Sequence, residues 1–164
     1  MSQTATDLQA LASWLQPLIA ALDAPARRSL AVKIARELRR QNQASMRAQT
    51  APDGTPWQAR KARIIAANGV RAGLSKARQR QGPMMAKLRQ TRYLPIKATP
   101  DDASITFAGR VLRIARVHQF GLPDRVSPGG PEHTYAERPL LGLSDNAQDT
   151  IKALVLDHLT PQKM

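Results

Sequence analysis

The side chains most often used in enzyme catalysis are scarce in this sequence. Histidine occurs at three positions, His118, His133 and His158, with no Gly-x-Ser-x-Gly motif and no glycine-rich phosphate-binding pattern. Cysteine is absent, which excludes a thiolate nucleophile, a disulfide framework and any metal site built on sulfur. His133 and Glu137 could face each other across one helical turn, but two ligands do not make a metal site. We therefore predict that the protein is not an enzyme and has no cofactor.

Positive charge is the chemistry that the sequence has in excess. The 164 residues include 25 lysines and arginines against 12 acids, which gives a formal net charge of +13 and favours polyanionic partners. No acidic residue lies between Gly54 and Pro100. This basic tract could bind nucleic-acid phosphates or an acidic protein surface in an assembly. It could instead be a solvated arm that becomes ordered only on assembly. Trp57 and Tyr93 are the only aromatic residues in the tract, with none between them, and no nucleic-acid-binding motif appears, which argues against sequence-specific binding.

The N-terminal quarter of the chain has the apolar spacing of two helices. Leucines recur every three or four residues from Leu8 to Leu22, behind possible caps at Thr6 and Asp7. A second helix begins at Asp23 and Pro25 and places Leu30, Ile34 and Leu38 on one face. The two helices form a predicted hairpin. It packs against the rest of the domain in preference to forming a coiled coil, because two heptads are too few.

The middle of the chain is a turn followed by the basic tract. Residues 51–57 contain a Pro-Asp-Gly sequence typical of tight turns, and Trp57 is expected to anchor this turn to the helices. Glycines interrupt the tract, so we expect only short helices, at residues 59–67 and 83–92. Residues 58–92 are interpreted as a basic arm or insertion.

The C-terminal half has mixed patterns. Residues 94–98 and 103–108 predict a β-hairpin, residues 111–120 fit a helix or a strand, and residues 122–138 predict a loop. Phe120-Gly121 is a typical helix end, with Gly121 left-handed and Phe120 expected in the core. If the segment is helical, His118 is expected to be partly buried and hydrogen-bonded. A last helix follows Ser144 and has one apolar face, which includes Ile151 and Val155.

Together these elements predict one α+β domain over residues 1–164. It has an N-terminal helical hairpin, a small antiparallel sheet, a C-terminal helix and a basic irregular insertion. The apolar stretch from Leu15 to Leu22 contains Gln16 and Pro17 and follows no basic segment, so we expect neither a signal peptide nor a membrane span. The chain is expected to be made in a cytoplasm.

Four short motifs in this order resemble a known family. They are Pro-Asp-Gly-Thr-Pro-Trp at residues 52–57 followed by Arg-Lys at 60–61, Gly-Arg at 109–110, Val-His-Gln-Phe-Gly at 117–121 and Glu-Arg-Pro-Leu-Leu-Gly at 137–142. Over nearly its whole length the chain resembles the tail-completion protein S family of contractile-tailed phages, also called phage virion morphogenesis proteins. The resemblance implies a structural protein of a phage or prophage, without catalytic residues, that acts in tail completion and head-to-tail joining.

A more distant likeness to phage neck and tail-terminator proteins implies a homo-oligomeric ring, with six subunits as the favoured number. The ring would lie at the head-proximal end of the tail tube, and its partners would be tail-tube and neck or connector proteins. Nonspecific contact with the phage genome is compatible with this role, and no membrane is involved. We expect the protein in the virion tail or neck and, during assembly, in the host cytoplasm. The main alternative is a nonspecific nucleic-acid-binding protein that uses the basic tract. A third possibility is a role in head assembly or scaffolding, which would place the protein on immature capsids instead of tails.

Ring closure requires complementary patches on the two sides of each subunit. The arginines predicted for this assembly interface are Arg78, Arg80, Arg89, Arg92, Arg110, Arg125 and Arg138. Proline at 139 holds the chain extended, so the Arg138 guanidinium could bind a carboxylate on a neighbour or be an ordinary surface group. The residues to which we assign a structural role are Asp53, Gly54, Trp57, His118, Phe120, Gly121 and Pro139.

Overall fold

The computed structural model of the protein describes residues 2–20, 22–59, 82–125 and 129–160. The α-helices described are α1 (Ser2–Ala20), α2 (Ala24–Ala48), α4 (Gly109–Phe120) and α5 (Asp145–Leu159), and η1 (Thr91–Tyr93) is a 3-10 helix. Strands β1 (Ile96–Ala98) and β2 (Ala103–Ile105) form one antiparallel sheet, and β3 (Pro123–Arg125) and β4 (Glu132–Thr134) form another. The predicted α+β class, with helices at the N-terminal end and a C-terminal helix, is confirmed.

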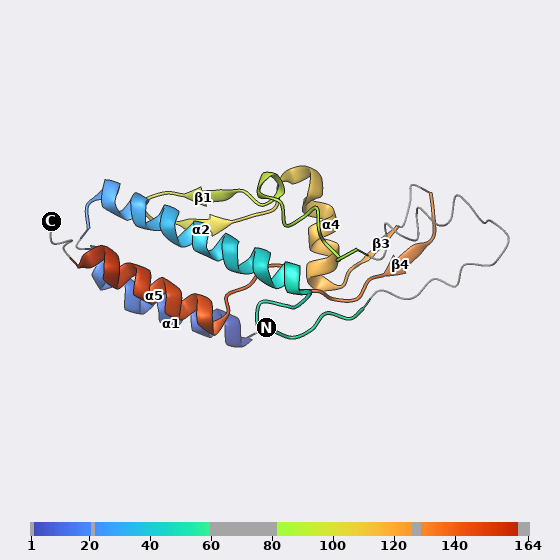
Figure 1. The fold of residues 1–164 in the computed structure, drawn as a ribbon, viewed down its shortest axis with the longest axis horizontal. Coiled ribbons are helices and arrows are strands. Elements are labelled where there is room, and N and C mark those ends of the chain that lie inside the picture. Colours follow the sequence, from blue (N-terminus) through green and yellow to red (C-terminus); the bar gives the residue numbers. More distant parts are fainter. Residues whose placement is uncertain (1, 21, 60–81, 126–128, 161–164) are drawn as a thin grey trace.

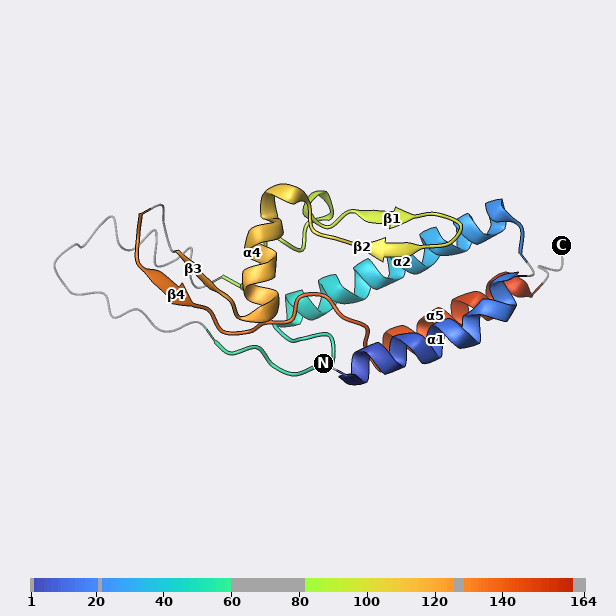
Figure 2. The same ribbon diagram turned by 180° about the vertical axis from the view of Figure 1, so that it is seen from behind.

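Helix α2 forms the central layer of the fold (Figure 1). The β1–β2 hairpin packs on one side of α2, and helices α1 and α5 lie side by side on the other. Helix α4 stands near the C-terminal end of α2, as the reverse view also shows (Figure 2). As a result, α2 separates α4 and the hairpin from the α1–α5 layer.

The ends of α2 follow from local sequence. The Asp23 carboxylate accepts a hydrogen bond of 2.8 Å from the backbone N–H of Ala26, which is the predicted N-cap. The helix ends at Gln49, which is left-handed with φ of 63°. Helix α1 begins at Ser2, so the prediction that Thr6 and Asp7 cap it is wrong, because both positions lie inside the helix.

A first hydrophobic cluster joins the three long helices. Leu11 of α1 meets Leu30 and Ile34 of α2 and Ile151 and Val155 of α5, and each of these side chains is buried. The predicted apolar faces of the first, second and last helices are therefore the ones that pack together. The preference for packing against the domain over a separate coiled coil is confirmed.

A second cluster fills the space between α2, α4 and the β1–β2 hairpin. Its buried members include Met46 of α2, Trp57, Leu94, Phe107 and Leu140. The cluster draws on five separate parts of the sequence and has few aromatic side chains. Because these parts are far apart in the chain, their packing fixes the position of α4 relative to α2.

The predicted hairpin at residues 94–98 and 103–108 is present as β1 and β2. Ile96 pairs with Ile105, and the Thr99 N–H donates to the Asp102 carbonyl across the turn. The helix predicted at residues 83–92 is wrong, because residues 84–89 form successive turns before η1. Met85 has φ of 60°, which is incompatible with a right-handed helix. Most of the helix predicted at residues 59–67 lies outside the described residues.

Residues 109–120 adopt the helical alternative as α4. Gly121 ends the helix in the left-handed conformation, with φ of 62°, and donates to the Val117 carbonyl. The expectation that Phe120 anchors this end in the core is wrong, because 56% of the residue is exposed. Ala115 faces the core instead, and the rotation of α4 that buries it turns Phe120 outward.

The loop prediction for residues 122–138 is wrong in part, because the segment contains the β3–β4 hairpin. Pro123 pairs with Thr134 and Arg125 with Glu132. Each strand has three residues, and a proline is tolerated at the start of an edge strand. Helix α5 begins as predicted, since the Ser144 hydroxyl accepts from the Ala147 N–H at 3.1 Å. Among the described helices, none is long and apolar enough to cross a membrane.

Candidate functional site

Three of the four sequence motifs meet in space beside the C-terminal end of α2. The Trp57 indole is buried and its Nε1–H donates to the Pro139 carbonyl at 3.2 Å. The backbone N–H of Arg138 donates to the carbonyl of His118 at 2.6 Å. The turn at 52–57, the end of α4 at 117–121 and the segment at 137–142 thus form one unit, here called the motif junction.

Gln119 of α4 holds the segment at 140–142 with its side-chain amide. Its Oε1 accepts from the N–H of Leu140 at 2.8 Å and from that of Leu141 at 3.0 Å, and its Nε2 donates to the Leu141 carbonyl at 3.1 Å. Leu140 is fully buried, so its N–H has no access to water. The Gln119 side chain therefore supplies the hydrogen-bond partners that a neighbouring strand would otherwise give to this extended backbone.

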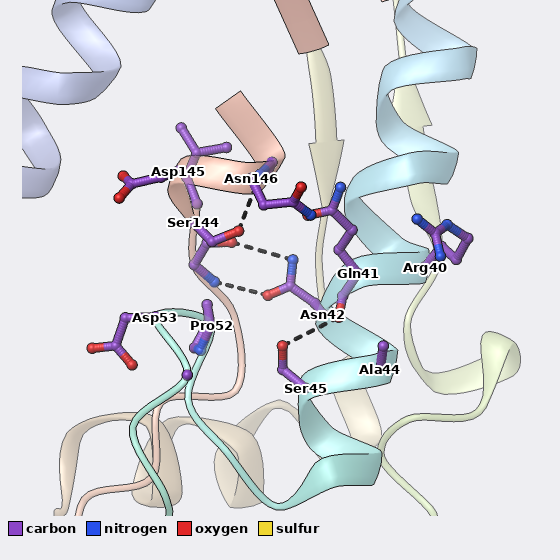
Figure 3. A pocket seen from close by; sticks show the side chains of 14 residues that line it. Arg40, Gln41, Asn42, Ala44, Ser45, Pro52, Asp53, Ser144, Asp145 and Asn146 are labelled. Atoms are coloured by element: carbon purple, nitrogen blue, oxygen red, sulfur yellow. Dashed lines mark hydrogen bonds between the residues drawn. The ribbon is translucent and has the colours of Figure 1, made fainter. Parts of the chain in front are cut away.

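Asn42 of α2 holds the next residue in the same way. Its Oδ1 accepts from the Gly142 N–H at 2.9 Å and its Nδ2 donates to the Gly142 carbonyl at 3.2 Å (Figure 3). Nδ2 also donates to the Leu38 carbonyl, and only 2% of Asn42 is exposed. A side chain on Gly142 would place its Cβ 2.9 Å from Cγ of Pro52, so glycine is required for this close approach.

An open hollow of about 880 Å³ lies beside the junction, between α2, the turn at 52–54 and the start of α5 (Figure 3). Arg40, Asp53 and Asp145 are among its charged lining residues. Arg40 is bound to Glu37, and this ion pair lowers the pKa of the Glu37 carboxyl below its usual range. Within the described residues, no group of three or more His, Cys, Asp or Glu side chains is placed to bind a metal ion.

Arg138 lies inside the motif junction and not on an outer surface. Only 7% of the residue is exposed. Its Nε and one terminal nitrogen donate to the Gln58 carbonyl at 3.1 and 3.0 Å, and the other terminal nitrogen donates to the Ala136 carbonyl at 3.3 Å. The interpretation of Arg138 as an ordinary surface arginine is therefore wrong, whereas its contact to a neighbouring subunit stays a prediction.

The structure brings together two of the predicted interface arginines. The guanidinium carbons of Arg92 and Arg110 lie 4.7 and 5.0 Å from the centroid of the Tyr93 ring. Both arginines are exposed, and the ring stabilises them through cation–π contacts. We call Arg92, Tyr93 and Arg110 the arginine–tyrosine cluster. It offers two closely spaced cations to an anionic partner.

The other predicted interface arginines do not join this cluster in the described structure. Arg89 is half-buried, and Arg125 is exposed on β3. Arg78 and Arg80 lie outside the described residues, so their assignment stays a prediction.

The remaining motif residues have local structural roles. The Asp53 carboxylate accepts from the Thr55 N–H at 2.8 Å, and Gly54 has φ of 90° in the same turn. His118 is half-buried, and its ring packs edge-on against that of Tyr135, with centroids 5.1 Å apart. A Cβ on Gly121 would lie 3.0 Å from the backbone nitrogen of Glu137. These contacts fix the turn at 52–57 and the end of α4 relative to the rest of the chain.

One ion pair links α4 to the β3–β4 hairpin. The Arg113 guanidinium binds the Asp124 carboxylate. This hydrogen bond holds the pKa of the Asp124 carboxyl below its usual range, with a smaller contribution from the backbone N–H of Arg125. The pair ties the hairpin to the helix on the side away from the core.

Sequence reasoning missed Asn42, Gln119 and Tyr93. The sequence signal for Asn42 is its position inside a helix. There an asparagine amide competes for the hydrogen bonds of the helix backbone unless it binds a partner elsewhere. Gln119 lies within a motif that was recognised, but its neighbours gave no sign of the segment it binds.

The side chains of Trp57, Gln119 and Arg138 thus bind backbone groups of their own chain and hold the motif junction together. The chain belongs to the phage virion morphogenesis family, whose sequence profile matches residues 6–160. It is 37% identical over 146 residues to the tail completion protein S of Escherichia phage P2, an alignment that covers 88% of this chain and 92% of that protein. The resemblance seen in the sequence is thereby confirmed. No solved structure shows a significant match to the chain.

Proposed function

We propose that the chain completes the tail of a phage and joins it to the DNA-filled head. Copies of the chain form a ring at the head-proximal end of the tail tube, stop further growth of the tube and offer a docking surface to the neck or connector. Family membership and the similarity to tail completion protein S of phage P2 support this proposal. The protein acts in the host cytoplasm during assembly and stays in the tail or neck of the virion.

The observation that carries the proposal is the motif junction. In this junction the side chains of Asn42, Gln119 and Arg138 each hydrogen-bond to backbone groups of a distant segment of the chain. A ring subunit must keep its two lateral surfaces in a fixed relation, because an error in angle is repeated at every contact around the ring. A rigid junction between α2, α4 and the segment at 137–142 meets this requirement.

The arginine–tyrosine cluster is the part of the surface that we assign to the head connector or tail tube. Arg92 and Arg110 are exposed, and Tyr93 limits their freedom, so less side-chain entropy is lost when they bind. Paired cations of this kind provide electrostatic complementarity to an acidic protein surface. No reaction is involved in this role.

The nucleic-acid alternative rests on the basic tract, of which residues 60–81 lie outside the described residues. The comparisons with known proteins give it no support. Binding to phosphates would weaken steeply as salt is raised, with a slope set by the number of phosphates neutralised. A salt titration of DNA binding by the purified chain separates this alternative from binding to an acidic protein.

The joining of heads and tails tests the proposal directly. Filled heads and tails are prepared from the parent phage with the gene for the chain deleted, and purified chain is added back. We expect joined particles only after addition. The double variant Arg92→Glu, Arg110→Glu should fail to join them, whereas the control Arg28→Glu, an exposed arginine of α2, should act like the wild type. Normal joining without the chain would refute the proposed function.

A further inference from the structure

The outward side of α4 combines apolar and positive side chains. Leu112, Arg116 and Phe120 follow one another at single-turn spacing, so they lie in one row along the helix. The exposed fractions of Leu112 and Phe120 are 41% and 56%, and Arg116 is exposed without an ion pair in the described structure. The row borders a groove of about 280 Å³ that Phe107 and Leu141 also line. We call this row and its groove the α4 face.

The outward side of α5 has a matching composition with the opposite charge. Asp149, Ala153, Leu156 and Asp157 are all exposed and recur at helical spacing, so they form one α5 face. Leu156 is 52% exposed. Lys152 lies 3.4 Å from Asp149, but Asp157 has no ion pair in the part of the chain that the structure describes.

The charge of the described helices follows the same division, with α4 positive and the α1–α5 layer negative. Helix α4 contains three arginines and no acidic residue. Helices α1 and α5 together contain four aspartates and one lysine, although the whole chain is strongly basic. Complementary charge on two different faces of one chain promotes association between copies.

The two faces lie on different parts of the molecule, because α2 separates α4 from the α1–α5 layer (Figure 2). A subunit therefore cannot bring its own α4 face onto its own α5 face. Contact between different faces of identical chains is heterologous, and it closes into a ring when the rotation between neighbours allows it.

We infer that the α4 face of one subunit docks onto the α5 face of a second copy of this chain. Leu112 and Phe120 pack against Ala153 and Leu156 of the neighbour, and Arg116 pairs with its Asp157. This inference rests on the proposed function, because the contact is the lateral contact of the ring. The contact would bury Phe120, which is exposed in the single subunit.

Cysteine cross-linking tests the contact, since the chain has no cysteine of its own. The double variant Leu112→Cys, Leu156→Cys is treated with a short bis-maleimide, both as purified protein and after addition to tails. We expect a ladder of cross-linked dimers, trimers and larger species on a denaturing gel. The matched control is Ile114→Cys, Leu156→Cys, because Ile114 is 50% exposed on α4 but lies on another side of the helix. It should lose the ladder.

Charge reversal supplies a second readout. Arg116→Asp or Asp157→Arg alone should reduce the ladder of the Leu112→Cys, Leu156→Cys protein, and the two reversals together should restore it. Dimers from Leu112→Cys alone would show a two-fold contact between α4 faces and overturn the inference. Absence of a ladder on tails that the same protein still joins to heads would also overturn it, while leaving the proposed function intact. Failure of wild-type chain to join heads and tails would instead refute the function.

Discussion

Replacing Gln119 with leucine removes the side-chain amide that holds the segment at 140–142 against α4. Three hydrogen bonds, of 2.8, 3.0 and 3.1 Å, are lost at once. Each contributes a net free energy of about 1 kcal/mol, and the buried N–H of Leu140 is left without a partner, which costs about 1–3 kcal/mol by itself. The apolar leucine recovers part of this loss. We expect the free energy of unfolding to fall by about 2–4 kcal/mol.

Urea unfolding followed by circular dichroism measures this change. For a urea m-value of about 2 kcal/mol/M, a loss of about 3 kcal/mol lowers the midpoint by about 1.5 M. Gln119→Glu keeps the acceptor for two N–H groups and loses the donor, so its midpoint should lie between those of the leucine variant and the wild type. Gln16→Leu, at an exposed position of α1, is the control and should change stability by less than about 0.5 kcal/mol. Equal midpoints for Gln119→Leu and Gln16→Leu would refute the role given to Gln119.

Three further predictions concern the supports around this segment. Asn42→Ala should lower the free energy of unfolding by about 1–2 kcal/mol and speed hydrogen exchange at the Gly142 amide, and unchanged exchange there would argue against the Asn42 contact. Gly121→Ala should cost about 1–2 kcal/mol in urea unfolding, because φ is 62° and the space for a Cβ is tight; a stability equal to the wild type would contradict this. The Asp124 carboxyl has a pKa that is lower in the folded than in the unfolded chain, so its pair with Arg113 stabilises the fold above the unfolded pKa of about 4 and is lost as the pH falls below it. Asp124→Asn should therefore make stability less dependent on pH in that acidic range, and an unchanged pH profile would show that the pair does not contribute.

The long helices could be predicted because their sequences contain both the packing face and the end signals. In α5, Ser144 supplies the cap, and Ile151 and Val155 lie one turn apart on the buried side. Asp23 provides the same kind of start for α2. The β1–β2 hairpin was recognisable from its β-branched residues and its intervening turn. Such signals are local, so they do not depend on how distant segments pack.

The errors occurred where tertiary contacts decide the outcome. Phe120 has the sequence context of a core anchor, but the rotation of α4 that buries Ala115 exposes it. Arg138 has the charge of a surface residue, but carbonyl groups at Gln58 and Ala136 satisfy its guanidinium inside the fold. Strand β3 lies in an exposed hairpin and lacks an alternating apolar pattern. None of these outcomes has a local sequence signal.

The position of the chain in the assembled particle tests the central claim most directly. Electron cryomicroscopy of joined particles, compared with tails made without the chain, would locate it. We predict additional density in the form of a ring between the head-proximal end of the tail tube and the head connector. Copies of the described structure, with helices α2, α4 and α5, should fit into this density. Additional density on the capsid shell or at the distal end of the tail, with none between tube and connector, would contradict the account.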